Sequence, residues 1–233
     1  PDEPAVESYR ALRTNVTFVG AEKPLQFIAV TSPGPREGKS TTAINLALTL
    51  AQSGRRTIVV DGDLRRSTLH RAFGLVQEPG LTDMLVGGVS ATEGIRPDVA
   101  ERLDLLPSGS TPPNPSELLG SSAMDALIKK LRHDYEYVIM DTPPTLPVTD
   151  AAVVASSADA TILVLRSGDT EETAAQRALS QLRRVRARIA GAVLNAVSQK
   201  KDPQYSYYSY SYRRGPPSRS RIRAAASKVA GFI

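Results

Sequence analysis

The sequence predicts a doubly wound α/β fold with a mostly parallel sheet. Short apolar runs alternate with segments of helical periodicity, which is the pattern of strands covered by helices on both faces. A loop rich in glycine and proline joins the first apolar run to a helix, and aspartates follow two of the later runs. We expect six strands, at residues 27–30, 57–60, 103–107, 135–140, 160–165 and 189–194.

The composition is that of a globular protein, with 41% hydrophobic and 23% charged residues. The sequence has no cysteine, which excludes disulfides, thiolate metal sites and a cysteine nucleophile. No apolar run approaches the roughly 20 residues of a membrane span, and no secretory signal is visible. We expect a cytoplasmic protein, and the start at Pro1 suggests that it was cut from a longer one.

A first helix is predicted at residues 5–19, because apolar side chains recur there every three or four residues. Glu7, Arg10 and Arg13 follow one another at intervals of three along one flank. The spacing alone favours an exposed ion pair on a solvated helix, worth roughly 0.2–0.5 kcal/mol. A charged contact with a neighbouring subunit is the alternative.

Residues 33–41 have the pattern of a phosphate-binding loop, since they lie between a strand and a helix and end in Gly-Lys-Ser-Thr. Glycines let backbone N–H groups turn toward a phosphate, with the positive end of the helix dipole behind it. Lys39 would reach the β- and γ-phosphates, and the Ser40 hydroxyl could ligate Mg²⁺. Pro33 stands where the usual pattern has its first glycine. The context still favours nucleotide binding over a chance glycine-proline turn.

Acidic side chains follow two of the predicted strands. Asp61 and Asp63 come after the second strand, and Asp141 comes after the fourth. Because ligands bind beyond the carboxyl ends of parallel strands, these aspartates are expected beside the loop, where they could approach one Mg²⁺. For Asp61 or Asp63 taken alone, a solvated loop carboxylate is the alternative. Asn195 ends the last strand at the same edge, where its amide would either contact a base or only terminate the strand.

The remaining segments carry less chemistry. Residues 67–102 are expected to form short helices and loops. A proline-stiffened loop is expected at 109–119, with a helix that begins at 116–117 and runs to about 132, and an amphipathic helix spans 171–188. Asp150 opens another helical stretch, as an N-cap or a supporting residue rather than as a catalyst.

The end of the chain differs in composition from the rest. Residues 198–233 contain eight Lys or Arg and a single acid, so they carry +7 while residues 1–197 carry −2. The basic balance therefore gives no reason to expect nucleic-acid binding by the body. We expect a body of residues 1–197 and a flexible tail of residues 198–233. Its basic end, residues 219–233, could lie on an anionic membrane, but a disordered solvating tail is favoured.

Five of the eight tyrosines in the chain interleave with serine in this tail. An edge strand or a stacking surface for single-stranded nucleic acid could use such a run. A flexible tail fits its lack of aliphatic residues better. The tyrosines are candidate phosphoacceptors, and each phosphate would add about −1.5 to −2 charges. They are Tyr205, Tyr207, Tyr208, Tyr210 and Tyr212.

Together these motifs resemble those of the bacterial tyrosine kinases of the P-loop type (BY-kinases), which accompany capsular and exopolysaccharide synthesis. The likeness runs over nearly all of residues 5–212, with six motifs in the family's order. The motifs are E-x-x-R-x-x-R at 7–13, Walker A at 33–41, Walker A′ (D-x-D-x-R) at 61–65, P-N-P-x-E-L-L at 113–119, Walker B (D-T-P-P) at 141–144, and the tyrosine cluster at 205–212.

The resemblance implies an ATP:protein-tyrosine phosphotransferase that modifies its own tail. Lys39 would bind the β- and γ-phosphates, and Asn195 would contact adenine. The other nucleotide-binding positions implied are Gly34, Glu37, Gly38, Ser40 and Thr41.

The resemblance also implies a division of labour among the acids. Ser40, Asp63 and Asp141 would hold Mg²⁺, partly through water, and Asp61 would accept the phenol proton. The physics agrees, because a phenol with a pKa near 10 is mostly protonated at pH 7 and phosphoryl transfer needs chiefly positioning and charge neutralisation.

Family members form rings in which one subunit's tail enters the next subunit's site. The resemblance therefore assigns Glu7, Arg10 and Arg13 to the oligomer interface. It further implies a transmembrane polysaccharide co-polymerase or activator segment, fused upstream or separate, and a tyrosine phosphatase as partners. The chain would then lie at the cytoplasmic face of the plasma membrane, and no nucleic-acid partner is expected.

Two other functions remain as alternatives. The first is an ATPase of the MinD/ParA type, which positions septa or segregates plasmids. Such proteins carry a second lysine early in the loop, where this chain has Gly34. The second is a nucleotide-gated scaffold without chemistry. An iron–sulfur reductase of the same fold is excluded by the lack of cysteine.

Overall fold

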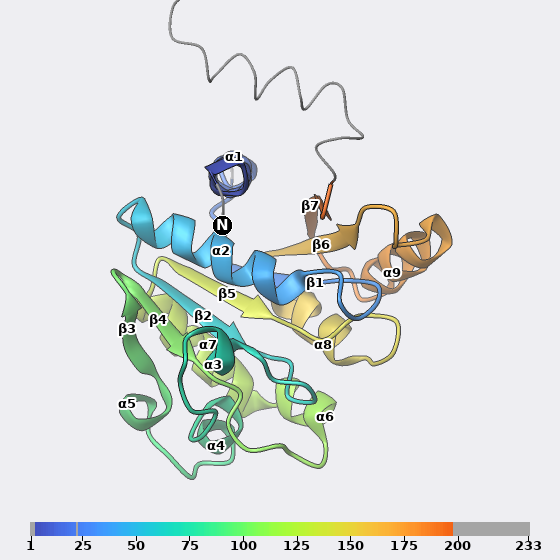
Figure 1. The fold of residues 1–233 in the computed structure, drawn as a ribbon. Coiled ribbons are helices and arrows are strands. Elements are labelled where there is room, and N and C mark those ends of the chain that lie inside the picture. Colours follow the sequence, from blue (N-terminus) through green and yellow to red (C-terminus); the bar gives the residue numbers. More distant parts are fainter. Residues whose placement is uncertain (1–2, 22, 198–233) are drawn as a thin grey trace, which may run out of the picture. The chain divides into compact units, whose positions relative to one another are not determined.

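The computed structural model describes residues 3–21 and 23–197. These residues form a seven-stranded sheet in the order β3-β4-β2-β5-β1-β6-β7, with helices on both faces (Figure 1). The strands are β1 (Phe27–Thr31), β2 (Thr57–Asp61), β3 (Arg96–Ala100), β4 (Leu103–Leu106), β5 (Tyr137–Asp141), β6 (Ala160–Arg166) and β7 (Ile189–Asn195). The helices are α1 (Glu3–Val19), α2 (Lys39–Gln52), α3 (Leu69–Ala72), α4 (Leu81–Leu85), α5 (Ala91–Gly94), α6 (Pro115–Leu119), α7 (Ser122–Asp134), α8 (Asp150–Ser157) and α9 (Glu172–Arg184).

The predicted doubly wound, mostly parallel sheet is confirmed, but the predicted strand count is wrong by one. Five of the neighbouring strand pairs are parallel. The additional strand, β3, pairs antiparallel with β4, with Arg96 opposite Leu105. The β3 sequence Arg-Pro-Asp-Val-Ala has no apolar alternation, so only backbone pairing defines it. Its proline is tolerated because β3 is an edge strand.

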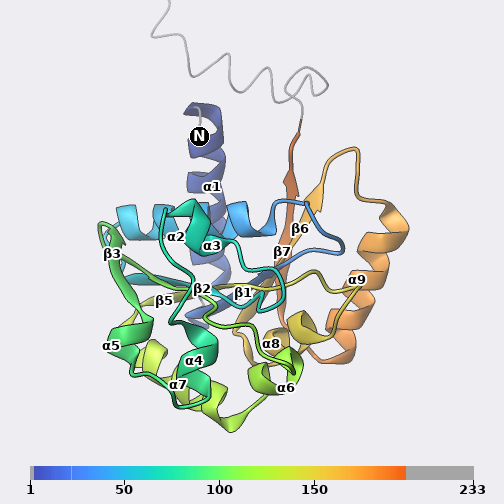
Figure 2. The same ribbon diagram turned by 60° about the horizontal axis from the view of Figure 1, so that its bottom comes forward.

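Helices bury both faces of the sheet. Helix α2 lies against one face, and α1 crosses the outer side of α2 steeply (Figure 2). Helices α7 and α8 pack on the opposite face, and α9 packs beside β6. Along β1, Ile28 and Val30 join the cluster on the α2 side, while Phe27 and Ala29 join the cluster on the α7 side. This alternation is that of a strand buried on both sides.

The parallel register brings the carboxyl ends of the central strands to one edge. Asp61 at the end of β2 is the register partner of Asp141 at the end of β5. Arg166 at the end of β6 pairs in the same way with Asn195 at the end of β7. None of the helices in the described part of the chain combines the length and apolarity needed to cross a bilayer.

We predict that Leu46→Ala lowers the free energy of unfolding by about 2–5 kcal/mol, because Leu46 of α2 is fully buried and its loss leaves a cavity. Urea denaturation measures this change. The control Val86→Ala, at a valine that is 67% exposed, should change stability by less than about 0.5 kcal/mol. Equal unfolding midpoints for both variants would show that α2 does not anchor this core.

Candidate active site

A cavity of about 790 Å³ opens at the carboxyl ends of the strands. Its walls come from the start of α2, from the loops that follow β1, β2 and β5, and from the last residues of β6 and β7. Gly38, Lys39 and Ser40 form the wall at the start of α2, Asp63 lies on the β2 side, and Asn195 lies on the β7 side. The predicted loop and two strand-end positions thus share one cavity.

Gly38 is required by both backbone conformation and packing. It caps α2 with φ 95° and ψ 20°, a left-handed conformation that side chains disfavour. A Cβ at this position would lie 1.9 Å from Asn195 Nδ2. Helix α2 begins at the next residue, Lys39, so the N–H groups of its first turn lie at the cavity wall, as an anion site needs.

Three predicted residues that line the cavity, Lys39, Ser40 and Asp63, converge on the buried Asp141 beneath its floor. Lys39 Nζ lies 3.1 Å from Asp63 Oδ2 and 3.5 Å from Asp141 Oδ2. Ser40 Oγ donates a hydrogen bond to Asp141 Oδ2 at 2.5 Å. The Asp141 side chain is fully buried, and those of Lys39 and Asp63 are nearly so. The fold therefore joins the ends of β1, β2 and β5 through one buried charge cluster.

The charged groups in this cluster shift one another's pKa values. Burial alone would lower the pKa of Lys39, but Asp141 and Asp63 outweigh burial and raise it, so the ammonium stays charged. Burial raises the pKa of Asp141 to about 7, although Lys39 opposes this shift. An additional cation beside Asp141 would favour its charged form.

The same cluster fits Mg²⁺ held together with a phosphate. Asp141 Oδ1 is buried and has no hydrogen-bond partner among the described residues. Over residues 3–21 and 23–197, no group of three or more His, Cys, Asp or Glu could hold a metal. Mg²⁺ usually takes one or two carboxylates plus water and substrate phosphates, so a complete protein cage is not needed.

Asp61 lies behind the floor rather than at the cavity surface. It is fully buried. Its Oδ2 atom accepts hydrogen bonds from Ser67 Oγ at 2.9 Å, Thr68 N at 3.1 Å and Leu69 N at 3.0 Å. Burial is the largest influence on its pKa and raises it. In this structure Asp61 therefore fixes the loop that follows β2.

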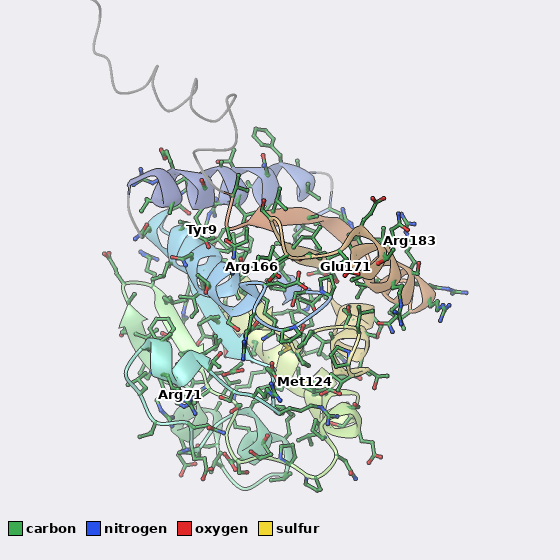
Figure 3. The ribbon with its side chains drawn as sticks, turned by 45° about the vertical axis from the view of Figure 1, so that its right-hand side comes forward. Tyr9, Arg71, Met124, Arg166, Glu171 and Arg183 are labelled. Carbon is green, nitrogen blue, oxygen red and sulfur yellow. The ribbon has the colours of Figure 1, made fainter. Side chains whose placement is uncertain are left out.

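Glu37 and Gly34 support the loop from behind and do not line the cavity. The Glu37 side chain accepts hydrogen bonds from Gly34 N and from Thr170 Oγ1, both at 2.7 Å. Thr170 Oγ1 in turn accepts from Arg166 N at 2.7 Å. Glu37 therefore connects the two ends of the phosphate loop to the segment after β6, which Figure 3 shows at Arg166 and Glu171.

Asn195 lines the cavity and also holds the phosphate loop. Its Nδ2 atom donates to the Glu37 carbonyl at 3.0 Å, and its Oδ1 atom accepts from Ala196 N at 2.8 Å. In this structure the side chain thus connects β7 to the loop. Its position beside Arg166 leaves it at the end of the cavity farthest along the sheet from β2.

Other predicted residues lie away from the cavity. Glu7 and Arg10 form an exposed pair on α1, 3.5 Å apart. Arg13 Nη1 donates to the Thr49 carbonyl at 3.2 Å and so connects α1 to α2. Tyr9 lies on the side of α1 that faces α2 (Figure 3). The five candidate phosphoacceptor tyrosines fall outside the described residues.

The structure adds an ion pair that sequence reasoning missed. The Arg65 guanidinium contacts both oxygens of the buried Asp150, through Nε at 2.8 Å and Nη2 at 3.2 Å. Ser116 Oγ donates to the same carboxylate. Burial opposes ionisation of Asp150, but these contacts outweigh it and lower its pKa. Arg65 is the last residue of the Walker A′ motif and Asp150 follows Walker B, yet a pairing across 85 residues leaves no local signal.

Comparison with known proteins shows the family. The model of an AAA domain matches residues 26–194. Tyrosine-protein kinase YwqD of Bacillus subtilis is 40% identical over 202 residues, which cover 87% of this chain and 85% of YwqD. This chain belongs to the bacterial tyrosine kinases of the P-loop type. The chain is also 36% identical to the putative tyrosine-protein kinase EpsB of Ralstonia nicotianae. That match covers 92% of this chain and 28% of EpsB.

Solved structures agree with this membership. The kinase domain of the Escherichia coli tyrosine kinase ETK has a TM-score of 0.81 at 36% identity, with 88% of this chain and 82% of that chain covered. The chimerical protein CapA2B2 has a TM-score of 0.82 at 36% identity, with coverages of 85% and 88%. The septum site-determining protein MinD of Pyrococcus horikoshii has a TM-score of 0.63 at 24% identity, with 79% of this chain and 76% of that chain covered. This likeness shows the fold alone.

The support of the loop by Glu37 can be tested by substitution. We predict that Thr170→Val raises the KM for ATP about three- to tenfold, because it removes one hydrogen bond to a buried carboxylate. Steady-state kinetics with varied ATP measure the change. Thr173→Val, at an exposed threonine in the same part of the chain, is the matched control and should leave this KM unchanged. The same KM in both variants would contradict the role given to Glu37.

Proposed function

We propose that this chain is an ATP-dependent protein-tyrosine kinase that phosphorylates its own C-terminal tyrosines in trans. The observation that carries the proposal is the convergence of Lys39, Ser40 and Asp63, at the cavity floor, on the buried Asp141. Family membership and the tyrosine-rich tail support it. Residues 1–197 would form the kinase domain, and residues 198–233 would form the substrate tail.

In the proposed reaction, the bond from the γ-phosphorus to the ADP oxygen breaks and a bond to the phenol oxygen forms. Lys39 would turn from the carboxylates to the β- and γ-phosphates, and Ser40, Asp63 and Asp141 would hold Mg²⁺. Bound Mg²⁺ would neutralise the charge that develops on the phosphate oxygens. Gly34, Glu37, Gly38 and Thr41 would shape or contribute to the nucleotide seat, and Asn195 would lie at its adenine end.

The phenol proton needs an acceptor, and we assign it to Asp61. Asp63 Oδ2 contacts Lys39 and Asp63 Oδ1 accepts from Arg66 N, so both oxygens of Asp63 are already engaged. Asp61 Oδ1 accepts only a long bond of 3.3 Å, from Asp63 N, among the contacts of the described residues. Asp61 Oδ1 is therefore less engaged than either oxygen of Asp63. Catalytic hydrogen bonds are often long in structures without substrate and shorten only when the substrates are bound.

The wider role follows from the family. We propose a ring of subunits joined through Glu7, Arg10 and Arg13, of which Glu7 and Arg10 are exposed. We also propose a transmembrane activator in capsular or exopolysaccharide synthesis, a phosphatase that resets the tail, and a site at the cytoplasmic face of the membrane. The coverage of only 28% of EpsB supports the idea that further segments accompany this domain, fused or separate.

Intact-mass analysis after incubation with Mg·ATP tests the proposed activity. We expect successive steps of one phosphate, located at Tyr205–Tyr212 by fragmentation, and no steps in Lys39→Met. Mixing Lys39→Met with active chain should restore phosphate to the Lys39→Met tail, because transfer occurs in trans. ATP turnover without any mass change would contradict kinase activity and favour an ATPase.

We predict that Asp61→Asn lowers phosphate transfer to tyrosine about 10²- to 10⁴-fold, because the amide cannot accept the phenol proton. Its affinity for Mg·ADP, measured by calorimetry, should fall far less than that of Asp63→Asn, since Asp63 belongs to the metal and phosphate floor. If Asp61→Asn kept more than a tenth of the transfer rate, the proton would pass to another group.

A further inference from the structure

The cavity extends along the carboxyl edge of the sheet, and its two ends are lined by different residues. Its walls follow the strand order β2-β5-β1-β6-β7. Arg166 and Asn195 stand at the β6–β7 end, and Lys39 and Ser40 stand in the middle at the start of α2. The opposite end is formed by the loop after β2 and by the apolar residues after β5, which include Pro144, Pro147 and Val148.

The geometry of phosphoryl transfer determines the end of the cavity at which the acceptor hydroxyl enters. The attacking and leaving oxygens lie roughly in line, on opposite sides of the γ-phosphorus. This step rests on the proposed function, in which adenine lies at the Asn195 end and the phosphates lie over the start of α2. The leaving ADP then extends toward β7. The acceptor hydroxyl must therefore enter from the β2–β5 end.

The β5 side of that end is held firmly in place. Thr31 Oγ1 donates to the Pro143 carbonyl at 2.9 Å, Thr145 N donates to the Ser32 carbonyl at 2.8 Å, and Leu146 N donates to the Pro33 carbonyl at 3.2 Å. These bonds fasten residues 143–146 to the start of the phosphate loop.

The other end of the segment is anchored by the Arg65–Asp150 pair and Ser116. The apolar residues between the two anchors are preformed, and binding to them costs little ordering entropy. The buried Asp150 carboxylate also offsets the charge of Arg65. An uncharged, flat side chain suits this surface better than an ionic one.

We propose that Pro144, Pro147 and Val148, here named the acceptor wall, bind the phenol ring of a tyrosine from residues 204–212 of a second copy of this chain. Residues 204–212 consist of Gln, Tyr and Ser and carry no charge, so no ionic group loses hydration on entry. A second copy is the source under the proposed function, in which transfer occurs in trans. The wall thereby selects tyrosine over serine.

A binding measurement tests the acceptor wall without requiring transfer. The probe is a labelled peptide of residues 203–213 with one tyrosine kept and the others replaced by serine, together with a version that has phenylalanine in its place. The protein is the full chain with its five tail tyrosines changed to serine, at saturating Mg·ADP. Residues 204–212 of this chain then have no aromatic ring for the wall to bind, so the peptide meets the same free wall in every comparison.

We expect Val148→Ser and Pro147→Ser to weaken binding of both peptides about three- to tenfold, because part of an apolar contact is lost. The all-serine peptide should bind more weakly than either. Val86→Ser, at an exposed valine outside the cavity, is the matched control and should match the parent chain. Thermal melting verifies that each variant is folded.

Two results would overturn the proposal that the acceptor wall binds the phenol ring. One is equal peptide affinity in Val148→Ser, Pro147→Ser and the parent. The other is a serine peptide that binds as well as the phenylalanine peptide. If the wild-type chain transfers phosphate to tyrosine while either result holds, the wall is wrong and the kinase proposal stands. If the ring-containing peptides bind as expected but wild type transfers no phosphate, the kinase proposal fails and the wall survives as a binding site.

Discussion

The buried contact between the Lys39 ammonium and the carboxylates of Asp63 and Asp141 is the interaction on which the rest of the site depends. It joins the start of α2, the loop after β2 and the end of β5, beside strands that are neighbours in the sheet. A buried charge that loses its partner is strongly destabilising, so these three groups constrain one another. A bound nucleotide can replace this arrangement only by supplying both a phosphate for Lys39 and a cation for the carboxylates.

Two further carboxylates hold the walls around this floor. Glu37 fastens the phosphate loop to the segment after β6, and Asp150 fastens the loop after β2 to the segment after β5. Neither Glu37 nor Asp150 lines the cavity. Their burial and their complete hydrogen bonding make them supports for the nucleotide side and for the acceptor side, respectively. The site is therefore preorganised by charges that do not face it.

Much of this arrangement could be predicted from sequence. Apolar runs ending in aspartate, together with a glycine loop before a helix, are local signals, and parallel topology carries Asp63 and Asp141 to the loop. The antiparallel strand β3 escaped prediction, because backbone pairing rather than apolar alternation defines it. The Arg65–Asp150 pair and the inward placement of Asp61 also escaped, since both depend on contacts between loops that no spacing encodes.

The most direct test of the account is the dependence of ADP affinity on Mg²⁺, measured by calorimetry for wild type and for Asp141→Asn. The account predicts that Mg²⁺ tightens ADP binding to wild type and that this gain is largely lost in Asp141→Asn, because the buried carboxylate that favours the cation is gone. An equal gain from Mg²⁺ in both proteins would contradict it. The carboxylates beneath Lys39 would then serve the fold rather than the nucleotide.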